Sequence, residues 1–355
     1  MVIATTAFLL TALVQSDSTP QDTTQRSKTT VLPVVSYSET TGLQYGATLF
    51  RGFRVSDRTE TRPSSVSLYV AFTAKKHAKA YGQLDRWSDD NATRSRARLE
   101  YISYPLPFFG IGGSTPDRAE EWYSSGVTTG HFFVERQWRG SVFVHGGVRY
   151  TRSRLRDVEA GGLLDQRAVP AAAGSDVLAA SFGVVVDSRD DVGAPGAGTY
   201  MRLLPSVASK VLNADAAFRR LTVDVRQYRS LGAHVVAAQV QYDGLNGAAP
   251  FDLMPMIGAD TALRGYPRGR YRDQHAFTSQ VELRSTRWRR FGAVVFAGAG
   301  TVAPRLSELT SGAWFPSFGA GARYLLSPRY RTIVRADLAA GRNSFGIHLG
   351  IGEAF

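Results

Sequence analysis

About sixteen segments of the chain, most of them roughly 10 to 14 residues long, alternate between apolar and polar residues. In the segment 64–74, for example, Val66, Leu68 and Val70 fall on one face and serines on the other. Strands that cross a membrane at a tilt need about 9–11 residues, whereas strands in soluble proteins average about 5–6. The length and even number of these segments predict an all-β fold, an antiparallel transmembrane β-barrel of about sixteen strands. The expected strands cover residues 29–38, 42–53, 64–74, 79–87, 93–103, 120–135, 139–154, 175–186, 198–208, 215–229, 232–243, 275–287, 290–301, 315–326, 330–340 and 343–355.

Residue composition by itself admits two classes of protein. A chain of 355 residues with 43% hydrophobic and 20% charged residues could form two soluble domains or one large barrel. Past the N-terminus no run reaches the roughly 18 apolar residues that a membrane-spanning helix requires, which argues against an α-helical membrane protein. A soluble all-β binding protein is the remaining alternative, and it would be extracted into buffer without detergent.

Arginine carries most of the net charge of +12. In residues 96–101 (RARLEY) arginines alternate with apolar residues along a strand, whereas nucleic-acid-binding proteins gather them on a helix or in a tail. We therefore expect no nucleic-acid partner. This spacing indicates a basic face that lines a lumen or meets lipid phosphates, so we expect the phospholipid and lipopolysaccharide of an outer membrane as partners.

The start of the chain is typical of an exported protein. Residues 1–16 form a short apolar run that ends in small or polar residues, as in a signal peptide, although no positive charge precedes it. A buried N-terminal strand is the alternative. Residues 17–28 are a polar linker, and we expect the barrel domain to cover residues 29–355. Cysteine is absent, so the chain has no disulfide framework and no cysteine-based metal site or nucleophile.

A long loop, residues 256–274 (MIGADTALRGYPRGRYRDQ), interrupts the strand pattern between the eleventh and twelfth expected strands. A loop this long is normally a solvated excursion or a disordered linker. Its flanking strands, however, each have an apolar face and a strongly polar one, and Glu282 and Arg284 project from the polar face. These strands are therefore expected to form a barrel wall whose polar face meets water.

The last expected strand places apolar residues at alternate positions from Phe345 to Ile351 and ends on Phe355, with Glu353 as an exception. A terminal phenylalanine after such a row resembles the signal by which outer-membrane barrels are recognised for assembly. We therefore expect Phe355 to act as an assembly signal and the barrel-assembly machinery to insert this chain.

Four stretches carry a family resemblance. They are Leu263-Arg264-Gly265-Tyr266 in the long loop, YPLPFFGIGGST at 104–115, DSRDDVGAPGAGTY at 187–200 and RADLAAG at 335–341. In their order and spacing the chain resembles the BamA/TamA-type outer-membrane barrels of the bacterial surface antigen family, over about residues 29–355. The resemblance implies a place in the bacterial outer membrane and a task in inserting or translocating proteins, and sometimes lipids.

The resemblance also implies a role for the long loop. In the family this loop folds back into the barrel, and its arginine, here Arg264, pairs with acidic groups on the inner wall. A planar cation with five donors can bridge carboxylates bidentately. We expect Glu282 as its first partner and Asp337 as its second. The family commonly has an aspartate on the thirteenth strand, where this chain has Gly298.

Most members of the family also carry periplasmic POTRA domains that receive clients. This sequence resembles a short member that consists of the barrel alone. An unknown protein client and a separate periplasmic partner are therefore further expected partners.

The strands that would close the barrel contain residues that weaken strand pairing. Pro33 removes a backbone donor from the first strand, and Gly346, Gly350 and Gly352 lower the order of the last. These residues predict a weak lateral seam that could open as a gate into the bilayer. The alternative is ordinary: prolines begin many strands, and glycines relieve crowding in curved barrels.

No enzyme chemistry is recognisable in the sequence. It contains no G-x-S-x-G or H-E-x-x-H motif and no phosphate-binding loop with its lysine, so we expect no catalytic residue and no cofactor. Asp187, Asp190 and Asp191 could bind a hard cation, but such a cluster is more often a solvated turn, and we expect no metal. The predicted function is that of an assembly or translocation barrel; a passive pore or structural barrel is the alternative.

Overall fold

The computed structural model describes residues 7–8, 29–38, 42–56, 60–116, 119–212, 214–258, 262–285, 288–327 and 331–355. The expected signal peptide and polar linker lie outside these residues, except for β1 (Ala7–Phe8), which pairs with the strand that begins at Thr29. Both assignments stay predictions.

Sixteen strands of eight residues or more make up most of the described chain, and three further strands have two residues each. The long strands are β2 (Thr29–Ser38), β3 (Gly42–Phe53), β4 (Ser64–Thr73), β5 (Ala78–Trp87), β6 (Thr93–Phe108), β7 (Glu121–Arg139), β8 (Val142–Arg156), β9 (Gly174–Asp187), β10 (Gly198–Ala208), β11 (Phe218–Leu231), β12 (His234–Gly247), β15 (His275–Arg284), β16 (Phe291–Ala303), β17 (Phe315–Ser327), β18 (Thr332–Gly341) and β19 (Ser344–Ile351). The short ones besides β1 are β13 (Met256–Ile257) and β14 (Tyr271–Arg272), and the helices are the single 3-10 turns η2 (Lys210–Leu212), η3 (Phe251–Leu253) and η4 (Leu306–Glu308). None of the described helices has the length and apolar character needed to cross a membrane.

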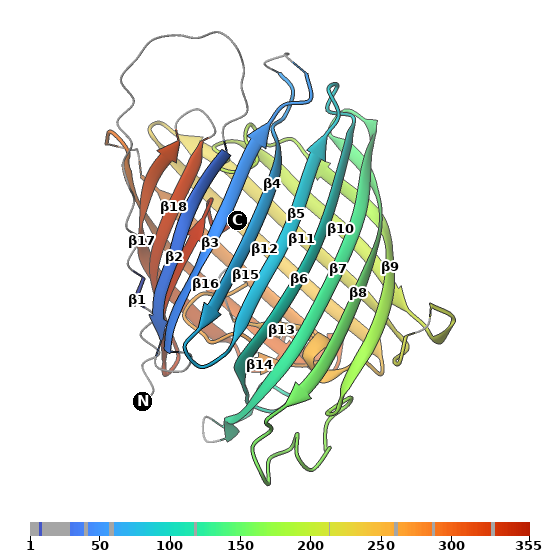
Figure 1. Ribbon diagram of the computed structural model, residues 1–355. Coiled ribbons are helices and arrows are strands. Elements are labelled where there is room, and N and C mark those ends of the chain that lie inside the picture. Colours follow the sequence, from blue (N-terminus) through green and yellow to red (C-terminus); the bar gives the residue numbers. More distant parts are fainter. Residues whose placement is uncertain are drawn as a thin grey trace.

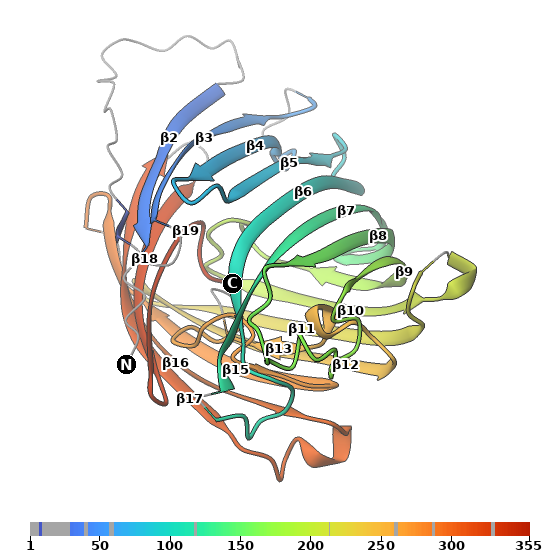
Figure 2. The same ribbon diagram turned by 60° about the horizontal axis from the view of Figure 1, so that its bottom comes forward.

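Each long strand pairs antiparallel with the next one along the chain, from β2 round to β19. The sheet curls round a central space, and its first and last long strands lie on the same side of the molecule (Figures 1 and 2). The structure confirms the predicted all-β barrel.

The two faces of the wall follow the alternation in the sequence. On β15, Val281 and Leu283 point outward and are each 46% exposed. Glu282 and Arg284, which alternate with them, point inward and are buried. Large apolar side chains such as Leu99 and Phe182 are likewise exposed on the outside. Since successive strand residues point to opposite faces, one strand supplies both an apolar surface for lipid and a charged surface for the lumen.

The last strand ends earlier than predicted. The expectation of a strand over 343–355 is wrong for its final residues, because β19 stops at Ile351 and Gly352 turns the chain with a φ of +87°, a left-handed conformation that glycine adopts at little cost. The Gly352 N–H donates to the Ile333 carbonyl at 2.7 Å. The residues after it run inside the ring of strands, where the C label lies in Figure 2. Phe355 therefore does not continue the apolar row of the last strand.

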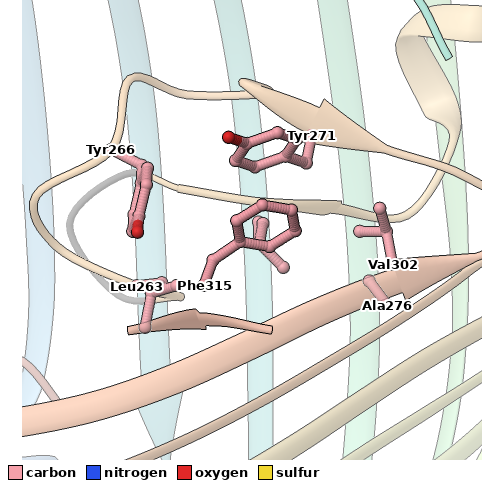
Figure 3. Close-up of a cluster of buried hydrophobic side chains, with 7 residues drawn as sticks. Leu263, Tyr266, Tyr271, Ala276, Val302 and Phe315 are labelled. Atoms are coloured by element: carbon pink, nitrogen blue, oxygen red, sulfur yellow. The ribbon is translucent and has the colours of Figure 1, made fainter. Parts of the chain in front are cut away.

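The loop between β12 and β15 contributes much of a hydrophobic cluster against the barrel wall (Figure 3). Tyr271 stacks on Phe315 of β17, with ring centroids 3.6 Å apart, and Leu263 and Tyr266 pack beside them. The full cluster is Ile257, Leu263, Tyr266, Tyr271, Ala276, Val302 and Phe315. This packing holds the loop against the β15–β17 part of the wall.

Candidate functional site

The turn that carries Arg264 is built on a glycine. Gly265 has a φ of +97°, and a Cβ on it would lie 2.8 Å from the carbonyl carbon of Ala340. A side chain at this position would therefore be excluded both by the backbone conformation and by β18. The Gly265 N–H donates to Nε2 of His348 on β19 at 3.2 Å, and the Ser317 hydroxyl donates to the Arg264 carbonyl. The loop backbone is thus seated directly on the wall.

Arg264 is 1% exposed as a whole residue, and its side chain lies between two carboxylates. Its Nη2 is 2.5 Å from Oε1 of Glu282 on β15, and its Nη1 is 2.6 Å from Oδ2 of Asp337 on β18. The guanidinium plane covers the Phe296 ring, with its central carbon 3.5 Å from the ring centroid. Phe296 projects from β16, so one cation joins three strands through ion pairs and a cation–π contact.

Both carboxylates are shared with other arginines. Glu282 also accepts from Arg284 at 2.9 Å, and Asp337 accepts from Arg323 at 2.5 Å and from Arg335 at 3.1 Å. Arg323 in turn reaches Glu353 at 2.6 Å. Four arginines thus meet three carboxylates in this network. Each of these buried carboxylates has more than one arginine partner. If one arginine is lost, the negative charge of the carboxylate is therefore still partly compensated by the remaining arginine.

Tyr266 fixes the loop next to Arg264. Its hydroxyl donates to the Pro316 carbonyl and accepts from the Arg342 N–H, each at 2.7 Å. The ring lies over Gly341, where a Cβ would come 2.6 Å from Cε2 of the ring. Gly341 therefore leaves the space that the Tyr266 ring fills.

The second half of the loop is held by the segment between β6 and β7. Arg270 donates to the hydroxyl and the carbonyl of Thr115 at 2.9 Å each, and the Gly112 N–H donates to the Arg272 carbonyl at 2.7 Å. The Arg272 guanidinium lies over the Phe108 ring at 5.1 Å. The stretch 104–115 thus forms a clamp on β14.

The last residues of the sequence dock inside the same lumen. Arg284 donates to the Phe355 carbonyl at 3.0 Å, and the Phe355 ring packs against Tyr228. The stretch 187–200 covers this tail, since the Glu353 N–H donates to the Gly193 carbonyl at 3.3 Å. Three of the stretches singled out in the sequence, 104–115, 187–200 and 335–341, therefore lie around the loop and the tail.

Comparison with protein families agrees with this arrangement. The model of the Omp85 superfamily domain matches residues 35–355. The chain belongs to the Omp85 superfamily. Members of this superfamily are outer-membrane β-barrel proteins, and this chain is likewise an outer-membrane protein. No curated protein matches the sequence.

Two solved structures share the Omp85 fold with this chain. One is BamA from Haemophilus ducreyi lacking POTRA domains 1–3, with a TM-score of 0.60, 14% identity, and coverage of 92% of this chain and 69% of that one. The other is CdiB from Acinetobacter baumannii, with a TM-score of 0.54, 11% identity, and coverage of 98% and 65%. At such identities these structures support the fold alone.

The inner wall of this Omp85 barrel places the sequence-predicted residues as follows. Glu282 and Asp337 both contact Arg264, whereas Gly298 on β16 offers no side chain, and the Phe296 ring lies under the guanidinium. Sequence reasoning missed Phe296, Arg323, Arg335 and Glu353. The signal that could have found the first three is the alternation of residues along β16, β17 and β18, which places Phe296, Arg323 and Arg335 on the inward face.

The seam residues lie on the two end strands. Pro33 lies on β2 opposite Ala47, while Gly346 and Gly350 lie on β19 opposite Ala339 and Arg335. Gly352, the fourth of the predicted seam residues, follows the end of β19.

The three aspartates considered for a cation have other partners. Asp187 pairs with Arg62 at 3.1 Å and with Arg189 at 2.8 Å. Asp190 and Asp191 accept backbone N–H groups of residues 193–197. In the described part of the chain no group of three histidines, aspartates or glutamates is arranged to hold a metal ion.

Burial shifts the pKa of several ionisable groups in the segment between β12 and β15. Desolvation raises the pKa of Asp252 in η3, and the positive charge of Arg272 offsets only part of that effect. Desolvation also raises the pKa of Tyr266, so its hydroxyl keeps the proton that it donates to Pro316. Desolvation raises the pKa of Asp273 in the same way, so this segment carries two carboxyls whose ionisation opposes docking.

Proposed function

We propose that this Omp85 barrel assembles or translocates proteins at the outer membrane, and that the loop is a plug released during the task. The observation that supports the proposal is the double ion pair of Arg264 with Glu282 and Asp337 at full burial. A passive pore has no need of a buried charge network between a loop and its wall, whereas a gate needs a contact that is strong when closed and cooperative when broken.

The network suits such a latch for an electrostatic reason. Loss of the two charged hydrogen bonds of Arg264 costs about 3–5 kcal/mol, at roughly 1.5–3 kcal/mol for each bond. Once Arg264 leaves, however, Arg284 still pairs with Glu282, and Arg323 and Arg335 still pair with Asp337. The wall is therefore stable with the loop out. A client or partner that competes for these carboxylates would shift the loop toward release.

The second part of the proposal is a lateral seam between β2 and β19. β19, with eight residues, is the shortest of the long strands, and Gly352 ends it by turning inward. Pro33 removes one donor from β2. A strand of eight residues can form only a short ladder with a neighbour, and a short ladder is the least costly one to open, so this seam is where a client strand could enter the bilayer.

Single-channel conductance in planar bilayers tests the plug. Wild type should be mostly closed with brief openings, and Arg264→Ala should conduct more. The matched control is Arg94→Ala: Arg94 is also buried and also contacts two carboxylates, Asp85 and Glu135, but on the wall away from the loop. This control should keep the wild-type pattern.

The same recordings separate the proposal from its alternative. Steady current of equal size in wild type and Arg264→Ala would mean that the loop does not gate the lumen. That result would favour the passive pore or structural barrel.

Spin-label distances test the seam without a known client. The absence of native cysteine permits labels on Tyr45 of β3 and Leu338 of β18, which lie outward on either side of the seam. Leu68 of β4 and Phe132 of β7 form the control pair, because three continuous ladders separate them by about 15 Å. A gate predicts a broader or two-peaked distribution for the seam pair alone. Equal narrow distributions would count against it.

A further inference from the structure

The inner wall away from the loop carries arginines in excess of carboxylates. On β6 and β11 the lumen-facing arginines are paired with acidic side chains. These pairs are Arg94 with Asp85 and Glu135, Arg96 with Asp85, Arg98 with Glu100, Arg220 with Asp243 and Arg226 with Asp224. Arg149 on β8 and Arg202 on β10 make no ion pair with any residue that the structure describes. On this part of the wall, as far as the structure describes it, the guanidinium groups of Arg149 and Arg202 therefore have no carboxylate in an ion pair with them.

The strand register explains why Arg149 has no partner. Its neighbours across the sheet are His131 on β7 and Ala179 on β9, and the next position along the same row is Ala208 on β10. Neither alanine can accept a hydrogen bond through its side chain. Arg149 points into the barrel and is exposed there, so an ion in the lumen can reach it.

Arg202 lies beside a carboxylate that is already occupied. It is paired across the sheet with Asp224, but Asp224 accepts from Arg226 at 2.6 Å and from Gln239 at 2.9 Å. The Nε of Arg202 is buried and has no hydrogen-bond partner in the described residues. A buried donor without an acceptor is costly, so this site favours a ligand that can accept.

The two groups belong to one positive field. Arg149 lies within electrostatic range of Arg98, Arg202 and Arg220, and four arginines, among them Arg149 and Arg202, act on His131. The strands hold these like charges together against their repulsion. An anion placed among them would relieve this repulsion and satisfy the free donors.

We propose that this basic patch, centred on Arg149 and Arg202, is an anion-binding site for phosphate groups. Phosphate carries up to two charges at neutral pH on oxygens that accept from more than one guanidinium, and the planar arginine fork matches its geometry. A single carboxylate would compensate only one of the two cations. The site would take a di- or polyphosphate or a phosphorylated solute within the lumen. It is independent of the loop latch, because Arg149 is accessible with the loop docked.

Isothermal titration of inorganic pyrophosphate into the full chain in neutral detergent tests this site. Wild type should bind saturably, with affinity falling as KCl is raised. Arg149→Gln/Arg202→Gln should weaken binding by at least roughly tenfold, since charge-assisted hydrogen bonds to both arginines are lost. Arg149→Lys/Arg202→Lys should keep part of the affinity, because the charges remain.

A double variant on the outer face provides the matched control. Arg152→Gln/Arg219→Gln removes the same net charge from exposed positions that alternate with lumen-facing ones on β8 and β11. It should bind pyrophosphate as wild type does. Folding of each variant is checked by the heat-dependent mobility of the barrel on gels. Absence of binding by wild type at low salt, or equal affinity in the folded lumen variant, would overturn the proposal.

Discussion

The two sides of the inner wall use the same ion pairs with different results. Around Arg264 the loop covers the network, and the side chains of Arg264, Glu282 and Asp337 are each 0% exposed. On the opposite side Arg98 and Glu100 are paired at 2.9 Å but stay 24% and 20% exposed. Exposed pairs contribute about 0–1 kcal/mol, whereas breaking a buried one costs several times more. Burial by the loop, more than the number of pairs, distinguishes a latch from a solvated wall.

The strongest test of this comparison replaces one arginine on each side of the inner wall by alanine. Arg264→Ala should lower the free energy of unfolding by about 3–5 kcal/mol and expose residues 262–272 to trypsin. Arg94→Ala should also destabilise the barrel, because its two carboxylates become unpaired. The loop should then remain protected. Equal cleavage in both variants would show that general loosening, and not the latch, exposes the loop.

Carboxylate substitutions should show a graded effect. Asp337→Asn leaves three arginines short of an acceptor, Glu282→Gln two, so loop release should be larger for Asp337→Asn. We expect roughly 1.5–3 kcal/mol for each charged hydrogen bond lost. Proteolysis rates of the loop measure the order. Asp85→Asn is the control on the open side, and loop protection unchanged from wild type in Asp337→Asn and Glu282→Gln would contradict the latch.

A glycine pair tests packing in place of charge. Gly341→Ala would place a methyl group against the Tyr266 ring, with an expected cost of about 1–3 kcal/mol. Gly146→Ala on β8 has open space around the new methyl group and should be neutral or stabilise by about 0.5–1 kcal/mol. Denaturant unfolding of the refolded barrels gives both values. Equal effects would mean that the Tyr266 ring is free to move.

The smallest expected effect is a pH dependence of loop docking. The pKa of Asp252 is raised in the docked state, so that state binds more protons between the ordinary and the raised pKa. Docking should therefore weaken as the pH rises through this window, and the cost is fully present above the raised value. Asp252→Asn should reduce this slope and protect the loop slightly better at pH 7, while Asp273, whose pKa is also raised by burial, supplies the remainder. Proteolysis between pH 4 and pH 8 measures it, and an unchanged slope would assign it to another group.

Much of the fold could be predicted because strand alternation is a local property. The face on which Glu282 and Arg284 lie follows from period two alone, and the sixteen long strands follow from their length. The family resemblance supplied the expectation that Arg264 would meet Glu282 and Asp337.

Contacts set by register or by a turn could not be predicted. Arg323 and Glu353 meet only because Gly352 turns the tail inward, and Arg270 reaches Thr115 from 155 positions along the chain. Alternation within a strand indicates the inward face but not which residues meet across the lumen. The replacement of an aspartate by Gly298 was visible in sequence, whereas the Phe296 ring under the guanidinium was not.

The charge network around Arg264 has a mechanical consequence. A barrel changes shape when neighbouring strands slide or bend relative to each other. The backbone hydrogen bonds between strands resist such movement only moderately. Here side chains from β15, β17 and β18 are tied together through Glu282, Asp337 and Arg323, with Arg264 as the hub. The part of the wall from β15 to β18 should therefore move as one rigid unit. When the surrounding membrane deforms the barrel, the change in shape would then concentrate in the strand pairs outside β15–β18. It would be largest in the short ladder between β18 and β19.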